Sequence, residues 1–312
     1  MSRTSRLPSR LPSRLPGRLR RAVAGAALVG LGVLCAGCGG AATGASSGTP
    51  ATRLDPALRD LLPTQVRERG VLRVGTDASY APMSSFGSDG RTIQGVEPDL
   101  GAQIGRVLGV RVRFVVRDFT ALLPELRAGD LDLVMSAMTD TTQRARTVDF
   151  VDYFSAGTAI LVQRGNPDGV TDIEDLCGKV VAVERGTTQV DLLARAQGNC
   201  AGPRIDVRAF PTNSDALLRL RTGRAAAVLN DLPPAAFLVN DPRTRSHYQL
   251  ASTVQYEPGL YGIAVPKDRA GLRDAVKGAL EELLDRRVYA RVLDRWGVSG
   301  GAVDRVSVDN DR

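Results

Sequence analysis

The stretch GDLDLVMSAMTDTTQRARTVDF, residues 129–150, decides the fold of this chain. It begins with an apolar segment, Leu131 to Met135, of the kind that forms buried strands inside α/β sheets. Polar residues follow it, among them Ser136, Thr139 and Arg144. Open α/β sheets bind ligands beyond the carboxyl ends of their strands, so we expect these side chains at a ligand site. The planar, permanently charged guanidinium of Arg144 suits a carboxylate group.

Strand-like and helix-like segments alternate around this stretch in two series. The first runs from VLRVGT at residue 71 to LDLVMSA, and the second from KVVAVERG at residue 179 to AAAVLND. Such alternation predicts mostly parallel sheets with helices on their faces. Each series contains an amphipathic helix that ends at a glycine, Gly129 or Gly223, followed by a buried strand. Because every α/β protein contains such units, the repeat supports two α/β lobes more firmly than any particular site.

Two short segments between the series resemble crossovers between lobes. Residues 156–158 precede the second series, and residues 255–259 precede a further strand, Tyr261 to Val265. If that strand and the helices after it return to the first lobe, the first lobe is discontinuous. The predicted boundaries are residues 61–157 and 258–298 for lobe 1, residues 158–257 for lobe 2, and residues 299–312 for a polar tail.

The amino-terminal residues have the order of a secretory signal: an arginine-rich start without acids, an apolar stretch, small residues and Cys38. The apolar stretch, Ala22 to Leu34, is too short to span a membrane comfortably. The sequence LCAGCGG resembles a bacterial lipobox, whose cysteine is lipidated, although Cys35 stands where leucine is usual. A plain secreted protein or an uncleaved anchor is the alternative.

We therefore expect a signal peptide at residues 1–37 and a lipid-anchored flexible linker at residues 38–60. The lipid on Cys38 would hold the exported protein at the outer face of the bacterial cytoplasmic membrane. The pair Arg20-Arg21 leaves both general secretion and twin-arginine export open.

The distribution of charge argues against nucleic-acid binding. The formal net charge is +7, but seven of the 41 basic residues are arginines within the first 21 residues. The remaining 34 basic residues match the 34 acidic ones. Because the excess positive charge belongs to the leader and not to a folded face, it provides no electrostatic surface for nucleic acid.

The cysteines predict one disulfide. Cys35 leaves with the leader and Cys38 carries the lipid, so Cys177 and Cys200 remain as a pair in an exported domain, where oxidation is expected. Two free thiols or a metal site are the alternatives. The two cysteines make a poor set of zinc ligands, because His247 is the only histidine of the chain. A single histidine also excludes three-histidine metal sites, and its polar surroundings argue against a histidine-based catalytic triad.

Several segments resemble, in the correct order, bacterial extracellular solute-binding proteins of the polar amino-acid family, which serve ABC importers. They are VLRVGTDASYAP, GVEPDLGAQIGRVLG, FTALLPELRAGDLDLVMSAMTDTTQRARTVDF, DLCGKVVAVERGTTQ, LNDLPPAAF and YGIAVPKD. Several motifs in one order are more specific than any one alone. The resemblance covers about Val71 to Gly297 and implies a type II periplasmic-binding fold: two α/β lobes joined by a two-strand hinge, with the ligand in the cleft.

The same resemblance implies how an amino acid is bound. Arg144 pairs in bidentate fashion with the α-carboxylate, supported by the Thr139 region and Thr188. Asp231 binds the α-ammonium together with Ser136 or with backbone carbonyls. From the spacing alone, Arg144 is equally well a solvated helix charge and Asp231 a helix cap.

Other positions match those near the ligand side chain. Asp77 and Tyr80 approach it, Phe119 stacks on it, and Ala137 stands where some relatives have a second serine. The alternative is that Tyr80 and Phe119 only pack at the edge of the core, and that Asp77 only accepts hydrogen bonds from backbone N–H groups of its own turn. Glu184 lies near the ligand loop of lobe 2, where it reaches a basic ligand or pairs with a neighbouring arginine. The predicted ligand-binding residues are Asp77, Tyr80, Phe119, Ser136, Ala137, Thr139, Arg144, Thr188 and Asp231.

The resemblance implies a monomeric protein that captures a polar amino acid and delivers it by hinge closure to an ABC permease with its ATPase, without cofactor, metal or chemical step. Glutamine, glutamate, arginine, lysine, histidine and cystine remain open as ligands. One alternative is an enzyme resembling cyclohexadienyl dehydratases, with Glu184 or Asp77 in proton transfer. Another is a ligand-sensing receptor subunit.

Overall fold

The structure is a computed structural model that describes residues 52–311. The predicted signal peptide, the predicted lipidation site Cys38 and most of the predicted linker lie outside the described residues. Within residues 52–311, no helix is both long enough and apolar enough to cross a membrane.

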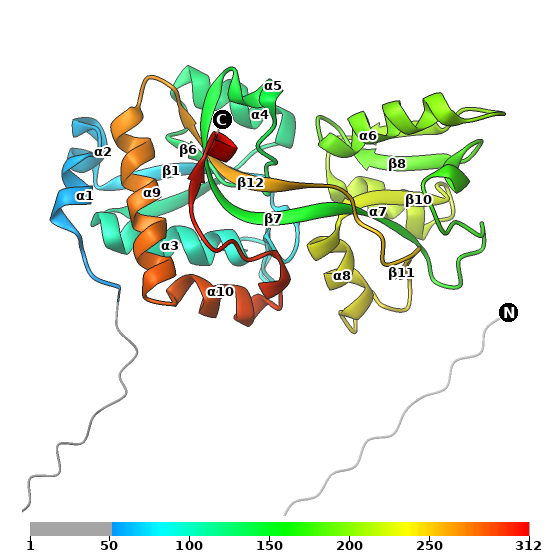
Figure 1. Ribbon diagram of the computed structural model, residues 1–312. Coiled ribbons are helices and arrows are strands. Elements are labelled where there is room, and N and C mark those ends of the chain that lie inside the picture. Colours follow the sequence, from blue (N-terminus) through cyan, green and yellow to red (C-terminus); the bar gives the residue numbers. More distant parts are fainter. Residues whose placement is uncertain (1–51, 312) are drawn as a thin grey trace, which may run out of the picture. The chain divides into compact units, whose positions relative to one another are not determined.

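Lobe 1 contains the amino-terminal strands and the carboxyl-terminal helices of the described chain (Figure 1). Before the hinge it comprises α1 (Pro56–Asp60), α2 (Thr64–Arg69), β1 (Val71–Thr76), β2 (Ser79–Tyr80), β3 (Ser84–Phe86), β4 (Ile93–Gln94), α3 (Val96–Leu108), β5 (Arg111–Val116), α4 (Phe119–Ala128), β6 (Leu133–Val134) and α5 (Thr142–Ala145). After the hinge it comprises α9 (Ala270–Asp285), α10 (Val288–Trp296), η3 (Ser299–Gly301), β13 (Ser307–Val308) and η4 (Asp309–Asp311).

Lobe 2 lies between the two hinge strands along the chain. The hinge strands are β7 (Val148–Gln163) and β12 (Tyr256–Pro266). The elements of lobe 2 are η1 (Glu174–Leu176), β8 (Val180–Glu184), α6 (Thr188–Ala196), η2 (Gln197–Asn199), β9 (Asp206–Phe210), α7 (Asn213–Arg221), β10 (Ala227–Asp231), α8 (Leu232–Asn240) and β11 (Tyr248–Leu250).

One sheet of the described residues joins the two lobes. Its strand order is β5-β1-β6-β12-β7-β10-β8-β9, and β11 and β13 also pair with β7. The strands β1, β5 and β6 are mutually parallel in lobe 1, and β8, β9 and β10 are parallel in lobe 2. The antiparallel pair β7 and β12 runs from one lobe to the other (Figure 1). This arrangement confirms the predicted fold with its two-strand hinge, whereas the residue boundaries of the lobes stay a prediction.

Helices bury the apolar faces of the sheet in each lobe. In lobe 1, α3, α9 and α10 pack into the largest apolar cluster and α4 into a second one. In lobe 2, α6 packs into one cluster, and α7 and α8 into another. The apolar stripe of α9 follows the helical period of three to four residues. Its buried residues are Leu272, Ala275, Val276, Ala279, Leu280 and Leu283.

The helix–glycine–strand repeat read from the sequence is present in both lobes. Gly129 ends α4 with φ 81°, and Gly223 follows α7 with φ 68°, so both adopt the left-handed conformation that glycine accepts without steric cost. The strand expected at residues 131–135 is shorter, because only Leu133 and Val134 pair within the sheet.

The fold begins earlier than residue 61, inside the segment expected to be a flexible linker. Asp55 caps α1 by accepting hydrogen bonds from the backbone N–H groups of Ala57 and Leu58, and Pro56 occupies the first turn. An acidic cap followed by proline is a common start of a helix. The side chain of Leu58 then packs against the core of lobe 1. A helix of five residues is too short to show an apolar period in the sequence.

The segment expected to be a polar tail also packs against lobe 1. Strand β13 pairs with β7, and the Ser307 hydroxyl donates a hydrogen bond to Asp152 Oδ2 over 2.8 Å. The backbone N–H of Asn310 donates to the same oxygen over 2.9 Å, and Val306 is buried. A two-residue strand carries no readable alternation, so the sequence pattern missed it.

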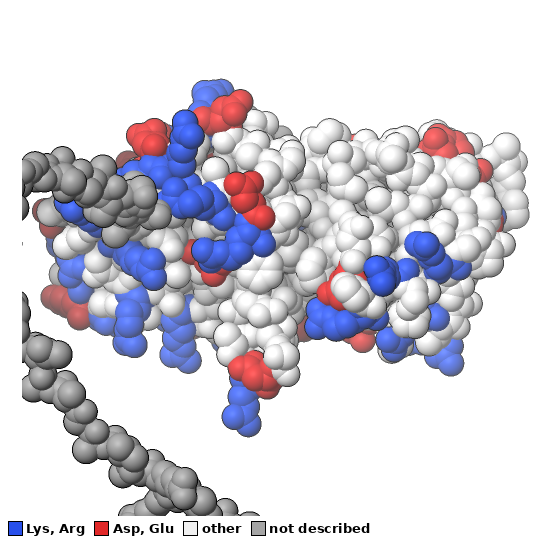
Figure 2. Space-filling model, turned by 90° about the horizontal axis from the view of Figure 1, so that it is seen from below, with Lys and Arg blue, Asp and Glu red and all other residues white. Residues whose placement is uncertain are grey.

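The surface carries charges of both signs. On the face drawn in Figure 2, lysines and arginines lie beside aspartates and glutamates. Several form ion pairs, such as Arg273 and Lys267 with Asp149. This mixed surface agrees with the balanced charge of the chain beyond its leader.

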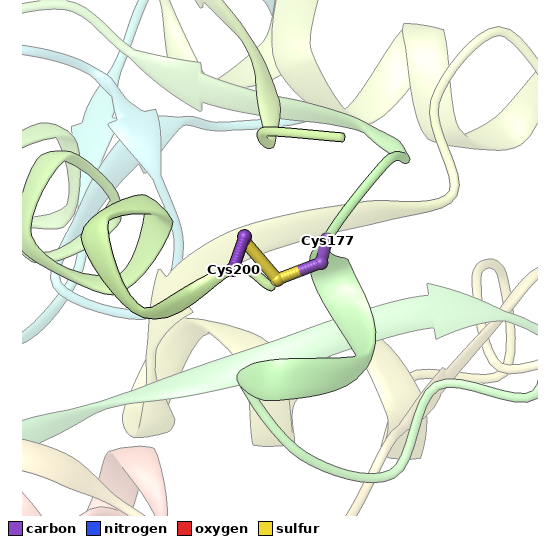
Figure 3. Close-up of a disulfide and its surroundings, with 2 residues drawn as sticks. All are labelled: Cys177 and Cys200. Carbon is purple, nitrogen blue, oxygen red and sulfur yellow. A yellow bond between two sulfur atoms is a disulfide. The ribbon is translucent and has the colours of Figure 1, made fainter. Parts of the chain in front are cut away.

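A disulfide joins Cys177 and Cys200, as predicted (Figure 3). Cys177 follows η1 and Cys200 follows η2, so the bond ties the segment before β8 to the segment after α6. The two Cα atoms are 5.7 Å apart and the residues are 23 positions apart in the sequence. Neither cysteine lines the cavity between the lobes, so the disulfide serves the stability of lobe 2.

We expect replacement of both cysteines by serine to lower the free energy of unfolding by about 3 kcal/mol, because the unfolded chain regains the entropy of an open loop. Urea unfolding of the oxidised protein and of the variant measures the difference. Dithiothreitol serves as the control, since it should lower the midpoint of the parent protein and leave the variant unchanged. Equal midpoints without reductant would contradict the assignment.

Candidate functional site

The carboxyl ends of strands from both lobes meet at one cavity. Asp77 directly follows β1, and the loop after β6 supplies the residues from Ser136 to Thr139. From lobe 2, Glu184 and Asp231 are the last residues of β8 and β10. The cavity lining includes every ligand-binding residue that the sequence predicts: Asp77, Tyr80, Phe119, Ser136, Ala137, Thr139, Arg144, Thr188 and Asp231.

Arg144 spans the cavity from lobe 1 to lobe 2. It lies in the short helix α5, whose first turn is capped by the hydroxyl of Thr141. One guanidinium nitrogen donates to the carbonyl of Thr139 over 2.8 Å, and the other donates to the carbonyl of Gly186 in lobe 2 over 3.0 Å. Burial lowers the pKa of Arg144 to about 10, so the guanidinium stays charged at neutral pH. Arg144 is thus a partly buried cation that lines the cavity.

Phe119 and Arg144 stack on each other. The guanidinium carbon lies 5.4 Å from the centre of the Phe119 ring, which is a cation–π geometry. Phe119 is the first residue of α4 and is buried. The ring was expected to hold the ligand side chain, and in this structure one of its faces supports the arginine. The aromatic ring thus positions the cation that faces the cavity.

Asp231 is a carboxylate in the cavity, and its negative charge complements the positive charge of Arg144. The hydroxyl groups of Tyr80 and Tyr261 donate to its Oδ2 over 3.0 and 2.6 Å, and Gln189 Nε2 donates to Oδ1 over 2.6 Å. Asp231 stands at the cap position of α8, but its side chain makes no capping hydrogen bond. Burial raises the pKa of Asp231 to about 6, against the hydrogen bonds and the nearby Arg144 that lower it. At neutral pH it is a buried carboxylate.

The loop after β6 is held by a buried glutamate. Glu97 accepts the backbone N–H of Ala137 over 2.6 Å and the Tyr153 hydroxyl over 2.5 Å on Oε1, and the Ser84 hydroxyl over 2.5 Å on Oε2. Ala137 has φ 45°, a conformation that is rare for a residue with a side chain. The Ala137 N–H thus ties the loop that presents Ser136 and Thr139 to Glu97, which Tyr153 and Ser84 hold in place.

Asp77 and Glu184 face each other from the two lobes. Both carboxyl groups are buried and line the cavity. Asp77 Oδ1 also accepts the backbone N–H of Ser79 over 2.7 Å, so the turn interpretation of Asp77 holds as well. Burial, together with the charges of Asp77 and Asp231, raises the pKa of Glu184 to about 9. Glu184 therefore keeps a proton at neutral pH, which avoids a further buried negative charge in the cavity.

Three lining residues were absent from the predicted set: Glu184, Thr187 and Gln189. They surround the predicted Thr188 in the segment ERGTTQ, where the chain turns from β8 into α6. Ser136 was predicted because ligands bind at the carboxyl ends of strands in such sheets. The same argument applies to Glu184, the last residue of β8. Gln189 could not be found in this way, because its role depends on reaching Asp231 across lobe 2.

The cavity is narrow in this structure. Only about 20 Å³ is open to the centre of a water-sized sphere, which is room for about one water molecule. A larger hollow of about 620 Å³ lies at Leu232, Phe237 and Trp296. Its lining is mainly apolar and offers no cation to pair with a carboxylate, so the charged cavity between the lobes is the stronger candidate.

Comparisons with known proteins agree with this geometry. Residues 72–299 match the family model of bacterial extracellular solute-binding proteins, family 3. The arginine-binding protein ArgT of Corynebacterium glutamicum is 29% identical over 81% of this chain and 83% of its own length. A mutant of ArgBP from T. maritima has a similar structure, with a TM-score of 0.68 and 32% identity over 77% of this chain and 99% of its own.

A second similar structure is that of an ancestral amino-acid-binding protein described as a precursor of cyclohexadienyl dehydratase. Its TM-score is 0.67, with 31% identity over 74% of this chain and 97% of its own. The family match covers almost the whole described fold, including both lobes and both hinge strands. The chain belongs to the bacterial extracellular solute-binding proteins, family 3.

Proposed function

We propose that this protein captures a polar amino acid in the cavity between its lobes and delivers it to an ABC importer. The observation that carries the proposal is the pair of opposite charges in one buried cavity: Arg144 for the α-carboxylate and Asp231 for the α-ammonium. A zwitterion supplies the complementary pair of charges. Ser136, Thr139 and Thr188 supply hydroxyl groups beside them.

Hinge closure is the proposed mode of capture. Contacts between the lobes join Arg144 to the Gly186 carbonyl, the Tyr80 hydroxyl to Asp231, and the backbone N–H of Asn213 to the Ser79 hydroxyl. Since the cavity has room for about one water molecule, an amino acid reaches it only when the lobes separate. A ligand favours closure because it contacts groups of both lobes, which are close together only in the closed form.

The proposal includes the export and anchoring predicted from the leader. Residues 1–37 direct export, Cys38 carries the lipid, and the segment before α1 tethers the fold at the outer face of the membrane. A monomer then meets the membrane permease in its closed form. The family description, which names extracellular proteins, supports this location.

A thermal-shift panel of the mature protein against the common amino acids and cystine tests the proposal, followed by calorimetry on each hit. A ligand that binds only the native state raises the melting temperature. We expect dissociation constants of about micromolar, since three or four charge-assisted hydrogen bonds of about 1.5–3 kcal/mol each offset the cost of association. The amide of each hit, which lacks the α-carboxylate, is the matched control. If no amino acid shifts the melting temperature, the proposal fails.

An enzyme on the same fold is a second candidate, and one observation favours it. Glu184 is a buried acid that holds a proton at neutral pH inside the cavity, and one similar structure is described as a dehydratase precursor. We propose binding without a chemical step, because the fold matches proteins described as amino-acid binders. Incubation with prephenate and with arogenate tests this choice, and product formation that Glu184→Gln abolishes would reverse it.

A further inference from the structure

The carboxyl-terminal segment of the described chain, residues 302–311, lies beyond the family match, which ends at residue 299. It follows α10 and η3 and then runs beside the hinge strands (Figure 1, red). Its strand β13 pairs antiparallel with β7, so that Ser307 lies opposite Asp152. The segment is therefore a feature of this chain that the family match does not cover.

Polar contacts fasten the segment to β7. The Ser307 hydroxyl and the backbone N–H of Asn310 both donate to Asp152 Oδ2, over 2.8 and 2.9 Å. In the opposite direction, the backbone N–H of Phe150 donates to Asp309 Oδ1 over 2.8 Å. Hydrogen bonds to an ionised carboxylate are stronger than those between neutral groups. The segment is thus held on β7 through its own side chains and through those of the strand.

The end of the segment adopts a conformation that needs such contacts. Asp309, Asn310 and Asp311 all have positive φ values, between 50° and 55°. Residues with a side chain enter this left-handed region at a cost, and they stay there only where surrounding contacts hold them. Arg305 forms an ion pair with Asp311, and the side chain of Val306 is buried in the apolar core of lobe 1. The segment is consequently seated on lobe 1.

Hydrogen bonds continue from the segment into the site. The backbone N–H of Val303 donates to the Tyr289 hydroxyl over 3.0 Å, and that hydroxyl donates to the Tyr153 carbonyl over 2.8 Å. Tyr153 belongs to β7, and its own hydroxyl donates to Glu97 Oε1, the oxygen that also accepts the Ala137 N–H. A continuous set of hydrogen-bonded residues therefore runs from the segment, through β7, to the loop after β6.

We propose that the carboxyl-terminal segment positions the loop after β6, which presents Ser136 and Thr139 to the cavity. By holding β7 at Asp152 and Tyr153, the segment keeps the Tyr153 hydroxyl on Glu97, and Glu97 in turn holds the loop. No residue of the segment lines the cavity, so it acts through these contacts and not by touching the ligand. Its effect on amino-acid affinity rests on the proposed function of the cavity.

The loop needs this support because its conformation is strained. Ala137 has φ 45°, which a residue with a side chain keeps only while neighbouring contacts hold it. If Tyr153 shifts, Glu97 loses a partner that holds it, and Ala137 can relax toward an ordinary φ. Ser136 and Thr139 then move with the backbone, and the two hydroxyl groups leave their places in the cavity lining.

Amide hydrogen exchange of the ligand-free protein, followed by mass spectrometry, tests the inference. Val306→Asp puts a charge at a buried position, and the segment avoids that cost only by leaving its seat. We expect peptides that span residues 136–139 to exchange about tenfold faster in this variant, while peptides of β8 and β9 in lobe 2 exchange as in the parent protein. Calorimetry with the amino acid that gives the largest thermal shift should show binding weakened about 2- to 30-fold.

Two further variants control for the substitution itself. Ala302→Asp introduces the same charge at an exposed residue of the same segment and should behave like the parent protein. Ser307→Ala removes only the hydroxyl that donates to Asp152, so it should stay folded and change the exchange in the same direction by a smaller factor. This milder variant decides the question if Val306→Asp fails to fold.

A double-mutant cycle separates positioning from a general loss of stability. Tyr153→Phe removes the hydroxyl that donates to Glu97 and leaves the segment in place. It should speed exchange at residues 136–139 by itself. Added to Val306→Asp, it should have much less effect than alone, because both changes act through the same contact. Fully additive effects would show that the segment does not act through Tyr153, and would overturn the inference.

The outcomes also separate this inference from the function on which its affinity effect rests. Parental exchange at residues 136–139 in both segment variants overturns the inference, whether or not an amino acid binds. If no amino acid binds the parent protein, the proposed function fails. The exchange series still decides whether the segment positions the loop, since it needs no ligand.

Discussion

Replacement of Arg144 by alanine is expected to abolish amino-acid binding while leaving the protein folded. The guanidinium would hold the α-carboxylate with two charge-assisted hydrogen bonds of about 1.5–3 kcal/mol each. Their loss weakens binding by roughly 10²- to 10⁴-fold, since about 1.4 kcal/mol corresponds to a factor of ten. Calorimetry with the best ligand of the parent protein measures the change.

The fold should tolerate this substitution. The two hydrogen bonds of the Arg144 guanidinium go to the backbone carbonyls of Thr139 and Gly186, and desolvation already opposes its charge. We therefore expect a melting temperature within a few degrees of the parent value. Arg146→Ala makes the same change at an exposed arginine two residues away and should leave the affinity unchanged. An Arg144→Ala protein that still binds with parental affinity would refute the carboxylate assignment.

Asp231→Asn is expected to weaken binding by about 10- to 100-fold. Asparagine keeps the size of the side chain but removes the negative charge that would pair with the α-ammonium, and one charge-assisted hydrogen bond contributes about 1.5–3 kcal/mol. The hydroxyl groups of Tyr80 and Tyr261 can rotate to accept from an amide as well as donate to one. The fold should consequently persist, and the effect should appear in affinity.

A comparison of ligands separates the charge of Asp231 from its packing. The parent protein should discriminate strongly against the desamino analogue of its ligand, and Asp231→Asn should discriminate far less. Asp206→Asn, which removes an exposed carboxylate of lobe 2, is the matched control and should retain the parental discrimination. Equal discrimination by Asp231→Asn and the parent protein would exclude the α-ammonium assignment.

The residues at strand ends could be predicted from the sequence because their positions follow from local rules. A buried apolar run predicts a strand, and a parallel sheet presents the residues after its strands at one edge. Ser136 and Thr139 were found in this way, and all nine predicted residues line one cavity. Their roles in binding an amino acid stay predictions that the substitutions above test.

The short elements could not be predicted, because their stability comes from tertiary contacts. The five-residue α1 depends on the packing of Leu58 against lobe 1, and the two-residue β13 depends on pairing with β7. Neither segment is long enough to show a period of apolar residues. For this reason the sequence predicts a linker at the residues of α1 and a polar tail at those of β13.

The sequence by itself determined the alternation of strands and helices, the two-lobe fold, the disulfide partners and the set of polar residues at strand ends. Only the tertiary structure decided which of these groups oppose each other. Asp77 and Glu184 are 107 positions apart in the chain, and no local pattern relates them. They become neighbours because the two lobes meet at one cavity, and burial there raises the pKa of both carboxyl groups.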